Sequence, residues 1–248
     1  MTVQKMTFVE HLADLRKRLI YILITLAVMF AASLTFISYI YRYLTRPVAR
    51  EGLRLMVISP GEVIAVYFLI SILVAVGLTL PFALYHVWRF VSPGLTPTER
   101  RYTLRLLPTA LLMFVLGVLF AWFLIFPTIF HFLIHLSKVN FNVQLRAEAY
   151  FGFITDICLP FGFIFELPIV VVFLTRIGLV RPAFLRRIRR YAYFVCAVLG
   201  VLISPPELVS HLSVVLPMIA LYEVSIGLSA LVQRRQEHRR KAVEQAWS

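Results

Sequence analysis

The sequence predicts an all-α integral membrane protein with six transmembrane helices. Of its 248 residues, 60% are hydrophobic and only 15% are charged, whereas a soluble domain carries roughly 25% charged residues. The apolar residues also gather in long unbroken blocks instead of alternating with polar ones. In addition, 25 Lys and Arg face only 12 Asp and Glu, and the basic residues flank the apolar blocks. This is the pattern of a chain whose charges set its orientation in a bilayer.

Six apolar segments are candidate spans of a single membrane domain over residues 1–248. The first four are long enough to cross a hydrocarbon core of about 30 Å at 1.5 Å per residue. The fifth reaches only about 21 Å, and Pro205–Pro206 separates it from the sixth, so helices five and six are expected to be short. A charged cytoplasmic tail over 233–248 follows. The predicted spans are 19–41, 63–88, 106–130, 150–175, 191–204 and 208–232.

The basic residues predict the orientation of these spans. The N-terminus, the loops after spans two and four and the C-terminal tail hold 19 Lys and Arg, and the opposite side holds six. Basic residues are retained on the cytoplasmic side, so both termini are predicted to be cytoplasmic. Four arginines in the first outside loop are a local exception. The first span, Leu19–Tyr41, has 23 uncharged residues, which is too long for the apolar region of a cleaved signal peptide.

Several classes of function are not supported by the sequence. There is no nucleophile elbow, zinc-protease motif, P-loop or glycine-rich phosphate cradle, so an enzyme is not expected. No metal site, cofactor or nucleic-acid-binding module is recognisable either, and the basic residues are expected to meet membrane lipids. Cys158 and Cys196 both fall within apolar spans, where they suit small buried residues better than a disulfide framework.

Two acidic residues on the predicted cytoplasmic side have two interpretations. Residues 7–19 form an amphipathic helix that enters the first span, with Asp14 just ahead of the basic cluster Arg16–Arg18. Glu99 stands near the start of the helix after Pro97. In one interpretation these carboxylates only make local ion pairs and favourable helix-dipole contacts. In the other, Asp14 and Glu99 together form an acidic patch for a cationic ligand.

Glu166 is the only charged residue within Phe161–Thr175. An acid in so apolar a segment is costly unless it faces water or a partner, and Pro160 and Pro168 predict a bent helix nearby. It therefore marks either a docking point for a polar partner or a proton relay. The relay would make the chain an ion-coupled small-solute transporter, although no internal repeat of the kind seen in many transporters is visible.

Five segments in this order resemble the TatC family, the multispanning subunits of the twin-arginine protein translocase. Singly they are short, but they are spread over nearly the whole chain. They are HLADLRKRL (His11–Leu19), FVSPGLTPTERR (Phe90–Arg101), FGFIFELPI (Phe161–Ile169), SPPELVSH (Ser204–His211) and PMIALYE (Pro217–Glu223).

The resemblance implies a fold and a function. The fold is six transmembrane helices with a cupped concave face and both termini cytoplasmic, in the cytoplasmic (inner) membrane of a prokaryote. The function is that of a receptor that binds the twin-arginine signal peptides of folded cargo proteins. The implied partners are those signal peptides, TatA/TatB-type single-span subunits in an oligomeric complex, and membrane lipids. Export by that complex is driven by the proton-motive force.

The resemblance also implies roles for particular residues. The family usually has glutamate where this chain has Asp14, and aspartate and glutamine where it has Glu207 and His211. Glu166 is implied to act within the membrane during signal insertion. The implied signal-peptide site comprises Asp14, Arg16, Phe90, Glu99 and Arg101, and the implied docking site for partner subunits comprises Ser204, Glu207, His211 and Glu223.

Overall fold

The computed structural model describes residues 8–94, 96–140, 143–205 and 207–247. The chain divides into two compact units. Unit 1 is formed by the chain up to Leu111 together with Gln144–Gly152, and unit 2 by Leu112–Val143 and the chain from Phe153 onward. Two helices, α5 and α7, begin in unit 1 and continue into unit 2.

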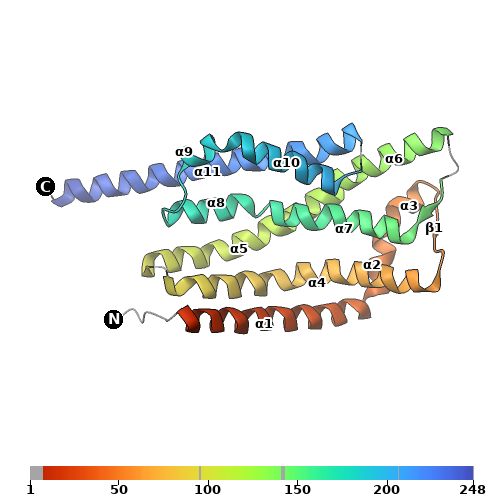
Figure 1. Ribbon diagram of the computed structural model, residues 1–248, viewed down its shortest axis with the longest axis horizontal. Coiled ribbons are helices and arrows are strands. Elements are labelled where there is room, and N and C mark those ends of the chain that lie inside the picture. Colours follow the sequence, from red (N-terminus) through yellow and green to blue (C-terminus); the bar gives the residue numbers. More distant parts are fainter. Residues whose placement is uncertain (1–7, 95, 141–142, 206, 248) are drawn as a thin grey trace. The chain divides into compact units, whose positions relative to one another are not determined.

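Unit 1 is built on two long helices, α1 (Phe8–Thr35) and α4 (Pro60–Val91), which pack along each other (Figure 1). Phe30 and Phe68 meet between them at 5.4 Å with their rings edge to face. The amphipathic segment predicted before the first span is continuous with it in α1, and 28 residues span about 42 Å. The helix ends at Thr35, earlier than the predicted boundary at residue 41.

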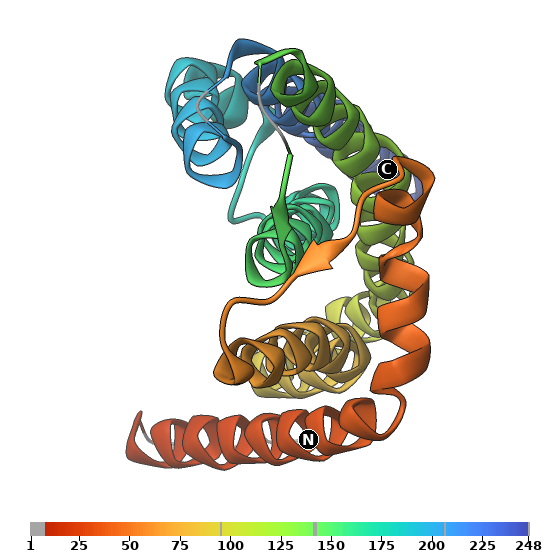
Figure 2. The same cartoon turned by 90° about the vertical axis from the view of Figure 1, so that its right-hand side faces the viewer.

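A short parallel strand pair, which the sequence did not suggest, joins two distant segments of unit 1. After α1 the chain forms α2 (Ile37–Leu44), α3 (Arg46–Arg50) and β1 (Leu55–Met56). Strand β1 pairs with β2 (Leu145–Arg146), as Figure 2 shows for the orange and green strands. Nearby, the Tyr150 hydroxyl donates a hydrogen bond of 2.6 Å to the Leu44 carbonyl.

The segments of the third and fourth predicted spans are interrupted helices. The turn η1 (Ser92–Gly94) leads from α4 to α5 (Pro97–Phe120), and a π-helical segment η2 (Ala121–Ile125) separates α5 from α6 (Phe126–Asn140). Helix α7 (Ala147–Ile164) gives way to α8 (Leu167–Arg176) at Phe165–Glu166.

The break between α7 and α8 has a local cause. Pro168 stands in the first turn of α8, and because proline has no backbone N–H it cannot donate to the carbonyl four residues earlier. The disturbance of the helix expected near this proline is present as an interruption between α7 and α8. Pro160, by contrast, is accommodated inside α7 without ending the helix.

Two glycines of unit 2 allow α5 and α7 to approach closely. A Cβ atom on Gly117 would lie 2.6 Å from the Phe161 carbonyl oxygen, and one on Gly162 would lie 2.6 Å from the Phe114 ring. Each glycine thus makes room for the other helix, and the Phe120 ring packs against Phe161 at 5.9 Å and Phe165 at 5.3 Å.

The C-terminal part of unit 2 contains α9 (Pro182–Arg187), α10 (Arg189–Ile203) and α11 (Leu208–Trp247). Helix α10 is short, as predicted. Helix α11 is not: it has 40 residues and continues through the charged tail. That tail consists largely of Gln, Arg, Glu, Lys and Ala, contains no proline or glycine, and therefore favours a helix. Pro206, in the predicted Pro-Pro turn, lies outside the described residues.

Five helical segments of the described chain are long and apolar enough to cross a membrane. The predicted count of six included α10, whose 15 residues fall short of a full span. The five segments are Leu12–Thr35, Pro60–Gly94, Leu104–Lys138, Ala147–Arg176 and Leu208–His238.

Candidate functional site

Asp14 is held by an ion pair at one end of unit 1. Its Oδ2 accepts a 2.7 Å hydrogen bond from Arg18 Nε, one helical turn further along α1. Both side chains are largely buried, with 20% and 13% exposed. The second oxygen, Oδ1, has no partner among the described residues. Asp14 is therefore fixed in orientation and still able to accept a further donor.

An aromatic cluster lies beside this pair. Tyr21 of α1 contacts His86 near the end of α4, with ring centroids 5.7 Å apart. Tyr85 contacts both His86 and Trp88, at 5.7 and 5.8 Å. The Nδ1 atom of His86 is buried and has no hydrogen-bond partner in the described structure. The sequence offered no signal for His86, because a single histidine at the end of an apolar helix has many structural uses.

The remaining residues predicted for this site come from the same end of unit 1. The start of α1, the end of α4 and the start of α5 lie together there (Figure 1). Arg16 and Arg101 are exposed and Phe90 is half-buried. Glu99 belongs to the first turn of α5, but its side chain lies outside the described residues. The structure thus gathers the elements that carry these five residues, and no described contact joins Asp14 to α5.

Glu166 occupies the break between α7 and α8 in unit 2. Only 8% of the residue is exposed, and its Oε1 atom is buried without a hydrogen-bond partner among the described residues. Its backbone carbonyl accepts from the Val170 N–H, which belongs to α8. A buried carboxyl oxygen without a partner is unfavourable in an apolar setting, so Glu166 is poised to accept a hydrogen bond from an incoming polar group.

Three of the four residues predicted for partner docking meet where α10 gives way to α11. Ser204 Oγ donates to the Gly200 carbonyl at 2.9 Å and lies 2.5 Å from His211 Nδ1. A hydroxyl has one proton, so His211 Nδ1 donates to Ser204 when that proton is used for Gly200. Glu207 is half-buried and its Oε2 has no partner in the described structure. These residues form one polar group at the end of two apolar helices.

Glu223, the fourth, lies elsewhere. It lies on α11, 16 residues after Glu207, which immediately precedes that helix, and this is about 24 Å at helical rise. Its two carboxylate oxygens accept hydrogen bonds from Arg189 at 2.6 Å and from the Tyr193 hydroxyl at 2.5 Å, both on α10. These contacts join α10 to α11. Glu223 is therefore engaged away from the docking group around Ser204.

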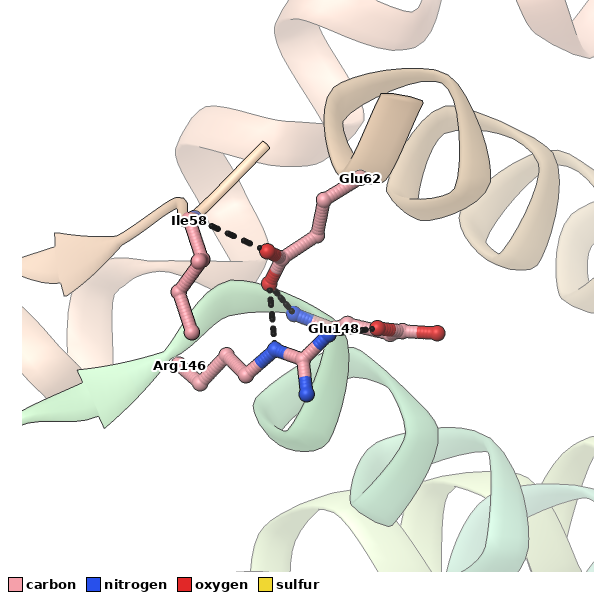
Figure 3. A network of polar contacts seen from close by, with 4 residues as sticks. All are labelled: Ile58, Glu62, Arg146 and Glu148. Carbon is pink, nitrogen blue, oxygen red and sulfur yellow. Dashed lines mark hydrogen bonds and ion pairs between the residues drawn. The ribbon is translucent and has the colours of Figure 1, made fainter. Parts of the chain in front are cut away.

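A polar network that the sequence did not reveal surrounds Glu62 (Figure 3). Glu62 is 4% exposed, and its carboxylate accepts from the backbone N–H of Ile58 at 2.9 Å, Arg146 Nε at 3.0 Å and the N–H of Glu148 at 3.3 Å. Arg146 also pairs with Glu148 at 2.7 Å. The sequence shows only an acid in the first turn of a helix, whereas two of its three partners, Arg146 and Glu148, are more than 80 residues away.

No group of three or more His, Cys, Asp or Glu side chains suited to a metal ion occurs among the described residues.

The comparison with known proteins concerns nearly the whole chain. A model of the family "Sec-independent protein translocase protein (TatC)" matches residues 10–217. The chain belongs to the TatC family.

Curated relatives and solved structures agree with this membership. The chain is 40% identical to the Sec-independent protein translocase protein TatCd of Bacillus subtilis over 231 residues, covering 92% of this chain and 93% of the relative. It is 37% identical to TatCy of the same organism over 238 residues, covering 96% and 94%. A crystal structure of the twin-arginine translocase receptor TatC superposes with a TM-score of 0.82 at 31% identity, covering 90% of this chain and all of that one.

Membership of the TatC family, together with the long apolar helices, makes this chain a multi-pass membrane component of Sec-independent protein translocation. The matched region, residues 10–217, contains Asp14, Glu99, Glu166 and the group around Ser204. Glu223 and the helical tail that follows it lie beyond the matched residues.

Proposed function

We propose that this protein is the receptor subunit of the twin-arginine translocase. It binds the twin-arginine signal peptides of folded proteins at the cytoplasmic face of the inner membrane, with both of its own termini on that side. Asp14 and Glu99 receive the arginines, and Arg16, Phe90 and Arg101 complete the binding surface. The observation that carries this proposal is the family match over residues 10–217, which includes both acids.

The environment of Asp14 supports such a role. Its Oδ2 is occupied by Arg18, while Oδ1 remains available, so a guanidinium from the peptide can bind without breaking the existing pair. Arginine suits a carboxylate because its planar fork of N–H groups donates charge-assisted hydrogen bonds in a fixed geometry. Tyr85, beside His86, is 41% exposed and offers a ring face on which a guanidinium can also stack.

The test is binding of a signal peptide with paired arginines and of its paired-lysine counterpart to the purified protein. Lysine keeps the charge but not the forked geometry, so the arginine peptide should bind about tenfold or more tightly. Asp14→Ala and Glu99→Ala should each remove most of that difference. Glu148→Ala is the matched control, a half-buried acid on a different part of unit 1 that should leave binding unchanged. Wild-type binding by both Asp14→Ala and Glu99→Ala would sink the assignment.

The steps that follow peptide binding, insertion of the signal and docking of partner subunits, involve polar residues of unit 2. Glu166, with a buried oxygen free to accept, receives a polar group of the inserted signal or of a partner helix. The group formed by Ser204, Glu207 and His211 docks TatA/TatB-type single-span subunits, which assemble with this chain for export driven by the proton-motive force. Glu223, already bound to Arg189 and Tyr193, supports docking indirectly by holding α10 against α11.

A second candidate is the ion-coupled small-solute transporter, favoured by the same buried oxygen of Glu166. It predicts that vesicles reconstituted with this chain alone carry a proton or solute flux that Glu166→Gln abolishes. The receptor predicts no such flux, and it predicts that Glu166→Gln impairs crosslinking to partner subunits while leaving peptide binding at the Asp14 site intact.

A further inference from the structure

A polar pocket of about 340 Å³ lies in unit 2 between the end of α8 and the charged part of α11. It has no part in the proposed signal-peptide or docking sites. The residues of its lining that bear on its chemistry are Thr175, Gly178, Arg181, Gln233, Gln236 and Glu237.

The walls of this pocket are fixed by contacts within the protein. Gly178 takes a φ of 81°, a left-handed conformation that ends α8 in a tight turn. Gln236 Nε2 donates to the Arg176 carbonyl at 2.8 Å, tying α11 to the end of α8. One turn deeper, the hydroxyls of Thr175 and Ser229 are 2.7 Å apart and buried. The pocket is therefore formed without a ligand.

The lining offers one cation and one anion that are not paired with each other. The Arg181 guanidinium makes no hydrogen bond or ion pair within the described part of the chain. Glu237 accepts only from Gln233 Nε2, at 2.9 Å, on its Oε1 atom. Gln236 uses Nε2 for the Arg176 carbonyl, which leaves its Oε1 as an acceptor. A ligand that combines a phosphate with a primary ammonium satisfies this set, the phosphate on Arg181 and the ammonium on Glu237 and the amide oxygen.

The position of the pocket along the helices corresponds to the lipid headgroups. The apolar span that includes α8 ends at Arg176, and the span of α11 ends at His238. Arg234 and Arg235, in the same part of α11, are exposed, as basic residues at a membrane interface are. Leu179, on the turn beside the pocket, is 72% exposed, which suits an apolar side chain that dips into the acyl region.

We propose that this pocket is a binding site for a zwitterionic phospholipid headgroup of the ethanolamine class. The phosphate binds Arg181, the ammonium binds Glu237, and the acyl chains run along the apolar surface of α8 and α11. A basic pocket between transmembrane helices is a recognised way to hold a lipid headgroup; the additional carboxylate of Glu237 is what selects a headgroup that carries its own positive charge.

The test is lipid binding to the full-length protein in detergent, measured by native mass spectrometry with phosphatidylethanolamine and phosphatidylglycerol in the same sample. The wild type should bind the ethanolamine lipid about tenfold more tightly, the value of one charge-assisted hydrogen-bonded pair. Glu237→Gln should abolish this preference, and Arg181→Gln should weaken both lipids by about tenfold. Arg186→Gln, an exposed arginine outside the pocket, should change neither.

Because both lipids compete within one sample, partial loss of folded protein does not alter their ratio. Soluble glycerophosphoethanolamine at the same concentration should not displace the lipid, because it lacks the acyl chains. An equal effect of Arg186→Gln, a preference that survives Glu237→Gln, or displacement by the soluble headgroup would each overturn the proposal.

Discussion

Glu62 shows how a single acid fixes the fold of unit 1. It is almost fully buried at the start of α4 and accepts three hydrogen bonds. One comes from Ile58, just before α4, and two come from Arg146 of β2 and Glu148 of α7, which are distant in sequence. Glu62→Gln replaces one acceptor oxygen by an amide NH₂, which would face the Ile58 N–H, a donor against a donor. We expect trypsin to cleave the neighbouring bonds after Arg50 and Arg54 several times faster in this variant.

The control for Glu62→Gln is Glu148→Gln. It removes the same charge and also contacts Arg146, but its side chain is 44% exposed, and exposed ion pairs contribute little. Its cleavage rate should stay close to that of the wild type. Equal rates for Glu62→Gln and the wild type would show that the network does not hold the segment around β1.

At the residue scale, the sequence reveals an acid whose neighbours in the chain are all uncharged. It does not reveal the role of an acid at a common position such as the start of a helix. Glu166 was recognisable because every nearby side chain is uncharged. Glu62 was not, because a helix-start glutamate is common and its partner Arg146 is far away in sequence. His86 was missed for the same reason: its significance depends on Tyr21, which approaches only when α1 packs on α4.

At the scale of elements, the close approach of α5 and α7 depends on glycine. A Cβ on Gly117 would lie 2.6 Å from a backbone carbonyl of α7, and backbone cannot move aside as a flexible side chain can. We expect Gly117→Ala to destabilise the protein by about 1–3 kcal/mol, the usual cost of overpacking. The measurement is reversible unfolding in mixed detergent and SDS micelles.

Gly227→Ala is the matched control for this substitution. Gly227 is also within a helix, but its Cβ would meet nothing within 4 Å. Alanine favours helix over glycine by up to about 1 kcal/mol, so this variant should be neutral or more stable. The expected changes in the free energy of unfolding have opposite signs for the two variants, which distinguishes packing from helix propensity. Stabilisation by Gly117→Ala would refute the packing argument.

The spans themselves were predictable from apolar run length, because a helix is the only open structure that satisfies its own backbone in lipid. The interruptions within these spans were harder to predict. The break at Glu166 follows from Pro168, whereas the π-helical segment Ala121–Ile125 has no sequence signal that separates it from regular helix. Helix α11 is longer than the predicted span 208–232, because the charged residues end only its membrane-embedded part and not the helix.

At the scale of the whole molecule, charge remains the guide to orientation, and it yields a direct test. The 19 basic residues on one side against six on the other predict cytoplasmic termini. The exceptional arginines of the first outside loop include two that lie over tyrosine rings, Arg42 on Tyr39 at 6.0 Å and Arg46 on Tyr43 at 5.1 Å. Such contacts suit an interfacial aromatic belt, so these arginines are compatible with the outside face.

Introduced cysteines and a membrane-impermeant thiol reagent test this orientation in intact cells. Arg54→Cys, exposed between α3 and β1, should be labelled without permeabilisation, whereas Arg235→Cys, exposed on α11, should be labelled only after it. The native Cys158 and Cys196 are 2% and 7% exposed and give the unreactive background in the unsubstituted protein. Labelling of Arg235→Cys in intact cells would show that the predicted orientation is wrong. The Asp14 site would then lie on the side of the membrane that cytoplasmic cargo cannot reach.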